Sequence, residues 1–314
     1  MKFPVVLFVY NRPDHTRRTV EALAANLGAG QASLTIFSDG PRDEAARPAV
    51  EAVRTYVRGV AELGSFGAVR IVERADNLGL AASVRSGVTE VLKEHEGCIV
   101  LEDDLVTAPD FLQFMTDCLE HYRDDPTVGS ISGYSALQAL PSDYPHDVYA
   151  IPRTCSTGWA TWRDRWSRVD WTLSAYPSFA ADRSLQLEYA KCGSDRPGRL
   201  RRQFEQGVKS WSAVFGFSQF LQGYNTIYPA VNRLIHIGDD GSGENALAGT
   251  AYNDDIPLEP RPYVLTSVTP DGRIMRAVSR AYSGGLATRI AGQLRRLGLG
   301  APVSVVKRWL GGRS

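Results

Sequence analysis

Four short apolar runs, each followed by a segment with helical periodicity, constrain the fold of this chain more than any other feature. The runs are rich in Val, Ile, Leu and Phe, which is typical of strands buried on both faces of a parallel sheet. Short connections between alternating strands and helices indicate a parallel sheet covered by helices on both faces. We expect strands at 4–10, 34–38, 68–72 and 97–101, with helices at 15–26, 45–63, 81–94 and 110–121.

Three consecutive carboxylates, Glu102, Asp103 and Asp104, follow the fourth apolar run. Open α/β sheets bind their ligands at the carboxyl ends of the strands. That much charge at a strand tip is unfavourable unless a cation or hydrogen-bond donors offset it. Oxygen ligands suit a hard divalent ion such as Mn²⁺ or Mg²⁺. The alternative is a solvated acidic turn, and the neighbouring strands must decide between the two.

Polar residues also follow the other three predicted strands: Asn11 and Arg12, then Asp39, then Asn77. Such residues would gather with the acids along one edge of the sheet. One of them alone is usually a helix cap, but several converging groups favour a ligand. The absence of GxGxxG and GxxxxGK[ST] after the first strand argues against NAD and P-loop sites. A diphosphate held through a metal on the acids, with Arg12 as counter-charge, remains.

Composition sets the broad class of protein. The 314 residues are enough for one large domain or two modest ones. Formal net charge is zero, so no overall field favours nucleic acid. The four cysteines form no CxxC pair, which indicates reduced thiols. No apolar stretch approaches the roughly 20 residues that span a bilayer, and no signal peptide is visible. We expect a soluble, cytoplasmic protein.

Five of the six tryptophans lie within residues 159–211. Such a cluster is either core or a platform on which a sugar ring stacks. Gly158 permits close approach of the backbone beside Trp159, and Arg153, Arg163 and Asp164 supply hydrogen-bonding groups. Both interpretations stay open.

Two later segments carry further hypotheses. In the polar, Gly-rich loop 232–243, His236 and Asp240 either complete the metal or diphosphate site or belong to a structural loop. From Gly272 onward there is no acidic residue. Leu286, Ile290, Leu294 and Leu297 recur there at helical spacing beside arginines. This basic amphipathic tail indicates peripheral contact with the inner face of the plasma membrane, or else a disordered or core-docking helix.

Four motifs resemble those of the GT-A glycosyltransferases: 10–13, 38–40, 77–79 and, most specifically, 100–111. The likeness extends over about residues 3–245, and it is nearest to bacterial family 2-type sugar transferases and N-acetylglucosaminyltransferase I. It implies an α/β GT-A fold, a mostly parallel sheet flanked by helices, with a mixed acceptor-binding half and a basic helical tail. We therefore expect a nucleotide-sugar-binding half at 1–105, an acceptor half at 106–265 and the tail at 266–314.

The resemblance implies transfer of a hexosyl or N-acetylhexosaminyl group from a nucleotide diphosphate sugar, UDP-linked by analogy, with inversion. The acceptor would be a glycan or lipid-linked molecule of cell-surface polysaccharide biosynthesis. By the same analogy Asp104 acts in catalysis through Mn²⁺ or Mg²⁺, which Glu102 and His236 also bind. The nucleotide would meet Tyr10, Asn11, Arg12, Asp39, Asn77 and Asp103. The sugar or acceptor would meet Arg153, Gly158, Trp159, Trp162, Trp211, Asp239 and Asp240.

The chain departs from the resembled enzymes at the expected catalytic base. They carry an Asp directly before a Trp at the start of a helix in the acceptor half, whereas here Lys209 and Ser210 precede Trp211. Glu205, Asp164, Asp239 and Asp240 are the candidate substitutes. The alternative function is a catalytically weakened nucleotide-sugar or glycan-binding protein of the same fold. A nucleotidyltransferase is disfavoured, because the basic Gly-rich loop expected after its first strand is absent.

Overall fold

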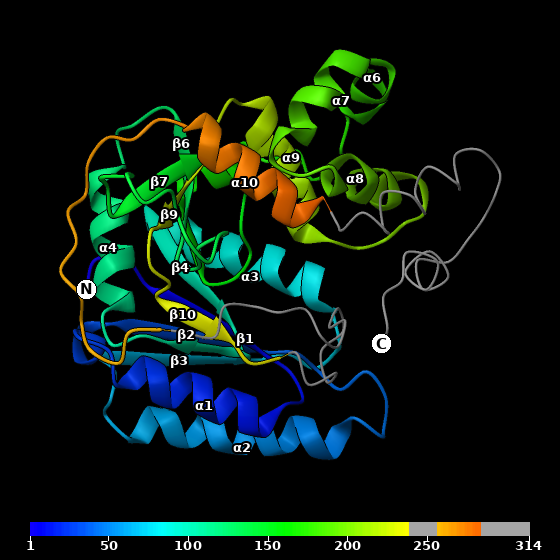
Figure 1. Ribbon diagram of the computed structural model, residues 1–314. Helices are drawn as coiled ribbons and strands as arrows, with labels where there is room; N and C mark the ends of the chain where they lie inside the picture. Colours follow the sequence, from blue (N-terminus) through cyan, green and yellow to red (C-terminus); the bar gives the residue numbers. More distant parts are fainter. Residues whose placement is uncertain (239–255, 284–314) are drawn as a thin grey trace, which may run out of the picture.

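An eight-stranded sheet with helices on both faces forms the centre of the computed structural model, which describes residues 1–238 and 256–283 (Figure 1). The strand order is β3-β2-β1-β4-β8-β6-β9-β7, and a separate two-stranded sheet pairs β10 with β5. The strands are β1 Val5–Val9, β2 Ser33–Ser38, β3 Ala68–Glu73, β4 Gly97–Glu102, β5 Leu105–Thr107, β6 Val128–Ser132, β7 Val148–Ile151, β8 Trp159–Trp162, β9 Asn225–Pro229 and β10 Leu234–His236.

The first four strands confirm the predicted parallel sheet. Strand β1 pairs in parallel with β2 and β4, and β2 pairs in parallel with β3. Every residue of β1 is buried, as expected for a central strand with helices on both sides. The carboxyl ends of all four strands therefore lie at one edge of the sheet.

The second half of the chain extends the same sheet in a mixed pattern. Strand β8 runs antiparallel to both β4 and β6, β9 is parallel to β6, and β7 is antiparallel to β9. Four of the seven pairings in the large sheet are parallel. Because β8 joins β4 directly, the two predicted halves share one sheet.

The helices cover the sheet on opposite faces (Figure 1). Side chains alternate along a strand, so Val5 and Leu7 pack with residues of α1, α2 and α4, while Val6 and Phe8 pack with residues of α3 and α9. The α-helices are α1 Pro13–Ala24, α2 Arg47–Glu62, α3 Leu80–Glu94, α4 Phe111–His121, α5 Arg163–Ser167, α6 Tyr176–Ala181, α7 Arg183–Tyr189, α8 Asp195–Glu205, α9 Trp211–Leu221 and α10 Gly272–Tyr282; two 3-10 helices are η1 Ala29–Gln31 and η2 Ala190–Cys192.

Helix α10, at the start of the predicted C-terminal tail, packs against the rest of the protein. It buries Ile274 and Val278 completely, in a cluster with Tyr149 of β7 and Tyr228 of β9. For 272–282 the structure therefore corresponds to the core-docking alternative. The amphipathic stretch from Leu286 to Leu297 lies outside the described residues, and so does the membrane hypothesis built on it. Within the described ranges, no helix combines the length and the apolar character that crossing a bilayer requires.

Candidate active site

The acidic triplet lies where β4 ends and the chain turns into β5. Thr19 of α1 holds this turn: its hydroxyl donates to the carbonyl of Asp103 at 2.8 Å and accepts from the amide of Leu105 at 3.2 Å. Since β1 is the parallel neighbour of β4, the residues that follow β1 reach the same turn. The backbone amide of Tyr10 lies 3.4 Å from a carboxylate oxygen of Asp103. The predicted meeting of the two strand ends is thus observed.

Arg12 forms ion pairs with two of the three acids. Its Nη2 contacts the carboxylate of Asp103 and lies 2.8 Å from Oδ2 of Asp104. Burial opposes the charge of Arg12, but the two aspartates raise its pKa above the ordinary value. Its Nη1 is buried and has no hydrogen-bond partner among the described residues. A buried donor without an acceptor is unusual, and an oxygen of an anionic ligand is one acceptor that would satisfy it.

The segment 236–238 lies over Asp104. Strand β10 pairs with β5, which puts His236 opposite Leu105 and its Nε2 3.3 Å from Oδ2 of Asp104. The amide of Ile237 donates to the carbonyl of Asp104 at 2.9 Å. A Cβ at position 238 would lie 2.5 Å from Oδ2 of Asp104, so only glycine allows this approach. The structure thus places His236 beside Asp104, and metal binding by His236 stays a prediction.

The pKa values of the three acids are shifted in different directions. Burial raises the pKa of Glu102 to about 8, and the negative charges of Asp104 and Asp103 act in the same direction. Burial also raises the pKa of Asp103, against the effect of Arg12. For Asp104 burial has the same tendency, but the hydrogen bond with His236 and the charge of Arg12 outweigh it and lower the pKa. Asp104 is therefore the carboxylate best kept ionised for a cation.

Whether these residues suit Mn²⁺ or Mg²⁺ depends on how many ligands the protein must supply. No group of three His, Cys, Asp or Glu side chains in the described part of the chain is arranged to hold a metal ion. Asp104 and His236 lie side by side as a pair, whereas no hydrogen bond or ion pair connects Glu102 to them within those residues. One carboxylate plus an imidazole fits a cation that takes its other ligands from substrate phosphates and water.

Asp39 and Asn77 stabilise the loop before α3. The buried carboxylate of Asp39 accepts from the amides of Leu78 and Gly79, the latter at 2.9 Å. The side chain of Asn77 donates to the carbonyl of Gly40 at 2.8 Å. These bonds fix the loop that leads into α3, although neither side chain caps the helix itself, whose N-cap is Gly79. Nucleotide contacts by Asp39, Asn77, Tyr10 and Asn11 stay predictions.

The tryptophans require a correction. Trp159 and Trp162 are each 1% exposed, so neither ring presents a face on which a sugar could stack. Trp159 stacks on Trp211 with ring centroids 4.9 Å apart, and the indole N–H of Trp162 donates to the carbonyl of Leu119. Trp211 is 5% exposed. The platform hypothesis is wrong for these rings, because β8 carries them into the core, and the core alternative holds.

Gly158 and Arg153 have structural explanations. Gly158 has φ +55°, and a Cβ there would clash with the side chain of Leu234 in β10. Arg153 is buried and makes a two-pronged ion pair with Asp195 at 2.9 and 3.0 Å. The remaining acceptor candidates, Asp239 and Asp240, lie outside the described residues.

The candidate catalytic bases within the described residues, Asp164 and Glu205, lie in different helices, α5 and α8. Asp164 is wrong, because β8 runs antiparallel to β4: Trp162 pairs with Gly97, so Asp164 lies at the amino end of β4, opposite the acidic triplet. Glu205, at the exposed end of α8, accepts from the hydroxyl of Tyr176. No ion pair or hydrogen bond joins it to the acids within the part of the chain that the structure describes. Ser210, at the position of the missing Asp, caps α9 by accepting from Ala213.

Sequence reasoning missed two features. Thr19 was not singled out, because only the structure shows that its hydroxyl is buried against the turn. Arg196 and Arg199 line a cavity beside α9. The sequence shows that the segment forming α8 is rich in arginine, but the spacing of these arginines does not indicate which of them line a cavity.

Comparisons with known proteins place the chain in a family. No curated protein matches its sequence. Among solved structures, S. aureus TarS matches at 11% identity and a TM-score of 0.40, covering 74% of this chain and 37% of that one. The 1–349 form of TarS matches at 10% identity and a TM-score of 0.42, covering 74% and 59%. The chain thus spans less than two thirds of either protein.

The family model described as glycosyl transferase family 2 matches residues 5–170, more than half of the 314 residues. The match includes β1 to β4, the acidic triplet and β8. The mostly parallel sheet with helices on both faces agrees with the predicted GT-A fold. The chain belongs to glycosyl transferase family 2.

Proposed function

We propose that this protein transfers a sugar from a nucleotide diphosphate sugar to a hydroxyl of a glycan or lipid-linked acceptor, with a divalent cation. The observation that carries this proposal is the meeting of Arg12, Asp104 and His236 at the carboxyl ends of β1 and β4. Family membership supports the reaction class. The proposal includes a UDP-linked donor, inversion at the transferred sugar and a role in cell-surface polysaccharide biosynthesis. It also includes a particular similarity to N-acetylglucosaminyltransferase I.

The residues suggest how donor binding and leaving-group departure are assisted. Asp104 and His236 would hold Mn²⁺ or Mg²⁺, and such an ion supplies neutralisation of the charge that grows on the leaving diphosphate. Nη1 of Arg12, which has no hydrogen-bond partner among the described residues, would donate to a phosphate oxygen. Asp103 keeps Arg12 in place through the ion pair on its other nitrogen. Gly238 lets the backbone approach Asp104 closely, which a side chain at this position would prevent.

One observation favours a second candidate, a nucleotide-sugar or glycan-binding protein without transfer activity. At the start of α9, where the resembled enzymes carry a carboxylate, Ser210 is a helix cap and Lys209 is exposed. An inverting transfer needs a base that removes the proton of the acceptor hydroxyl. The two candidates therefore agree on donor binding and differ on turnover.

A nucleotide-release assay separates them. The purified chain is incubated with a panel of nucleotide sugars, with Mn²⁺, with Mg²⁺ or with EDTA, and donor binding is measured in parallel by calorimetry. A transferase releases nucleotide from one donor in a metal-dependent manner, and more rapidly with acceptor. Metal-dependent binding without release would support the binding protein. Absence of binding for every activated sugar would contradict both.

A further inference from the structure

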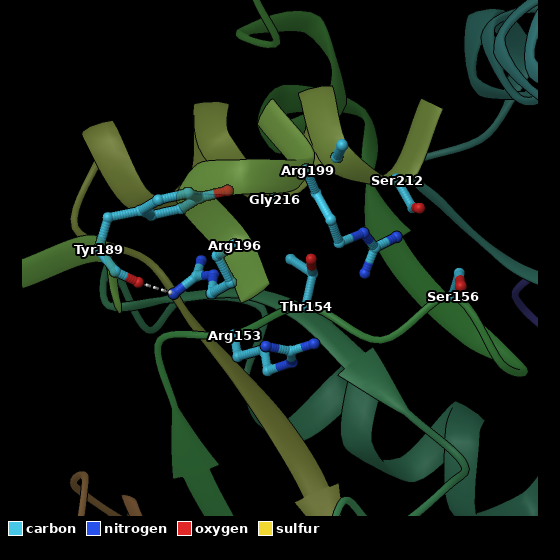
Figure 2. A pocket seen from close by; sticks show the side chains of 9 residues that line it. Arg153, Thr154, Ser156, Tyr189, Arg196, Arg199, Ser212 and Gly216 are labelled. Atoms are coloured by element: carbon cyan, nitrogen blue, oxygen red, sulfur yellow. Dashed lines mark hydrogen bonds between the residues drawn. The ribbon is translucent and has the colours of Figure 1, made fainter. Parts of the chain in front are cut away.

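A second polar site lies between residues 153–156, which precede β8, and helices α8 and α9. It is a cavity of about 60 Å³, several times the roughly 10–15 Å³ that one water needs. Figure 2 shows three arginines, Arg153, Arg196 and Arg199, and three hydroxyl side chains, Thr154, Ser156 and Ser212, around it. Of the described residues that line this cavity, none is acidic. We call it the arginine pocket.

The positive charges of the arginine pocket are not balanced. Arg153 forms an ion pair with Asp195, and the same carboxylate is 3.9 Å from Nη1 of Arg199. Arg196 is 6% exposed and has no carboxylate partner among the described residues. Among the described residues, one aspartate therefore offsets the charge of three arginines.

Arg196 has spare hydrogen-bond donors. Its Nη1 donates to the carbonyls of Pro152 at 2.7 Å and Tyr189 at 3.0 Å, and its guanidinium stacks 3.9 Å above the ring of Tyr189. These contacts fix the plane of the group, while Nε and Nη2 donate to no described residue. Burial lowers the pKa of Arg196, which reflects a cation short of counter-charge. A buried cation of this kind is unfavourable unless an anion pairs with it.

We propose that the arginine pocket binds a phosphate group carried by the acceptor. Guanidinium groups match the geometry of phosphate oxygens, and hydroxyls at the rim can donate to the same oxygens. The pocket belongs to the same edge of the sheet as the acidic triplet, because β8 is antiparallel to β4 and Trp159 pairs with Val100 near the carboxyl end of β4. Gly158, between the pocket and β8, packs against Leu234, two residues before His236. The assignment to an acceptor rests on the proposed function; the assignment to an anion does not.

Calorimetry with inorganic phosphate and with glycerol 1-phosphate, and with glycerol as the uncharged control, tests the pocket without any nucleotide. The test variant is Arg199→Gln, because Arg199 is exposed on α8 and its replacement leaves the core intact. The matched control is Arg201→Gln, on the same helix and also exposed but outside the pocket. We expect both phosphates to bind, Arg199→Gln to weaken them about tenfold, and Arg201→Gln to change nothing. Ser212→Ala provides a second, smaller loss.

Four results would overturn the inference. The first two are no binding of either phosphate and an equal loss of phosphate affinity in Arg201→Gln. The third is displacement of phosphate by UDP, which would assign the anion to the donor site. The fourth is binding of inorganic phosphate but not of glycerol 1-phosphate, which would contradict the assignment of the phosphate to the acceptor. UDP binding, measured on the same proteins, should be unaffected by Arg199→Gln. Wild-type protein that binds phosphate through Arg199 but binds no nucleotide sugar would refute the proposed function and the acceptor assignment, and would confirm the anion site.

Discussion

The acidic cluster at the end of β4 and the tryptophan cluster beside α9 are both buried, but they are stabilised in opposite ways. Asp103 and Asp104 are held by ion pairs and hydrogen bonds with Arg12, His236 and Tyr10. Trp159 packs between Trp211, Trp166 and Phe215, with centroids 4.9 to 5.7 Å apart. Charged partners can be exchanged for a ligand's charges, whereas rings that cover one another leave no face for one. We therefore expect substitutions in the acidic cluster to affect ligand binding and substitutions in the tryptophan cluster to affect stability.

The largest expected effect is on stability. Trp159→Ala should lower the free energy of unfolding by about 3–5 kcal/mol, because it leaves a cavity among aromatic rings. The partly exposed Trp171, which contacts Trp166 at the margin of the cluster, is the control, and Trp171→Ala should lose about 1 kcal/mol. Urea denaturation followed by circular dichroism measures both. A Trp159→Ala protein of wild-type stability that no longer binds sugar would restore the platform hypothesis.

The acidic cluster should show the reverse. Asp104→Asn should weaken Mn²⁺-dependent donor binding by about tenfold to a hundredfold while changing the free energy of unfolding by no more than about 1 kcal/mol. Asp164→Asn, at the opposite edge of the sheet, is the matched control and should bind donor normally. Titration calorimetry with and without EDTA reports the difference. Equal donor affinity and metal dependence in Asp104→Asn and wild type would show that Asp104 is no cation ligand.

Glu102 should make the protein less stable as pH rises. Its pKa is raised from 4.5 to about 8 in the folded state, so between these values the folded state keeps a proton that the unfolded state has released. The free energy of unfolding should therefore fall across this range, by more than about 1 kcal/mol. Glu102→Gln should remove that fall, and the two proteins should converge below pH 4.5. Parallel stability curves for wild type and Glu102→Gln would refute the assignment.

Asp170, next to the tryptophan cluster, should show the smallest effect and the opposite sign. Hydrogen bonds from Thr172 and Ser174 lower its pKa from 3.8 to about 2. Its contribution to stability is therefore complete above pH 3.8 and is lost as the pH falls towards 2. Because the site is near the surface, we expect about 1 kcal/mol or less, which Asp170→Asn should abolish. Acid denaturation curves would count against this if the two proteins unfolded at the same pH.

Sequence patterns predicted the parallel half of the fold well, and the reason is physical. An apolar run between helical segments has few alternatives to a buried strand, and parallel strands must present their carboxyl ends together. The positions of Arg12, Asp103 and Asp104 at one edge follow from that rule alone. Asp39 was found in the same way, but its bonds to the amides of Leu78 and Gly79 show that a polar residue after a strand can also serve to hold a neighbouring loop.

Only the tertiary structure determined where the residues of the second half lie. An antiparallel strand runs in the opposite direction to its neighbour, so the residues that follow it lie at the opposite edge of the sheet. The sequence left the segment at 159–162 open as core or as a sugar site; its insertion as β8 sends the indoles of Trp159 and Trp162 into the core and Asp164 to the far edge. The same insertion leaves residues 153–156 at the edge that carries the acids, beside arginines from a distant helix. Local composition determines which residues can be buried or charged; only the pairing of remote strands determines which of them meet.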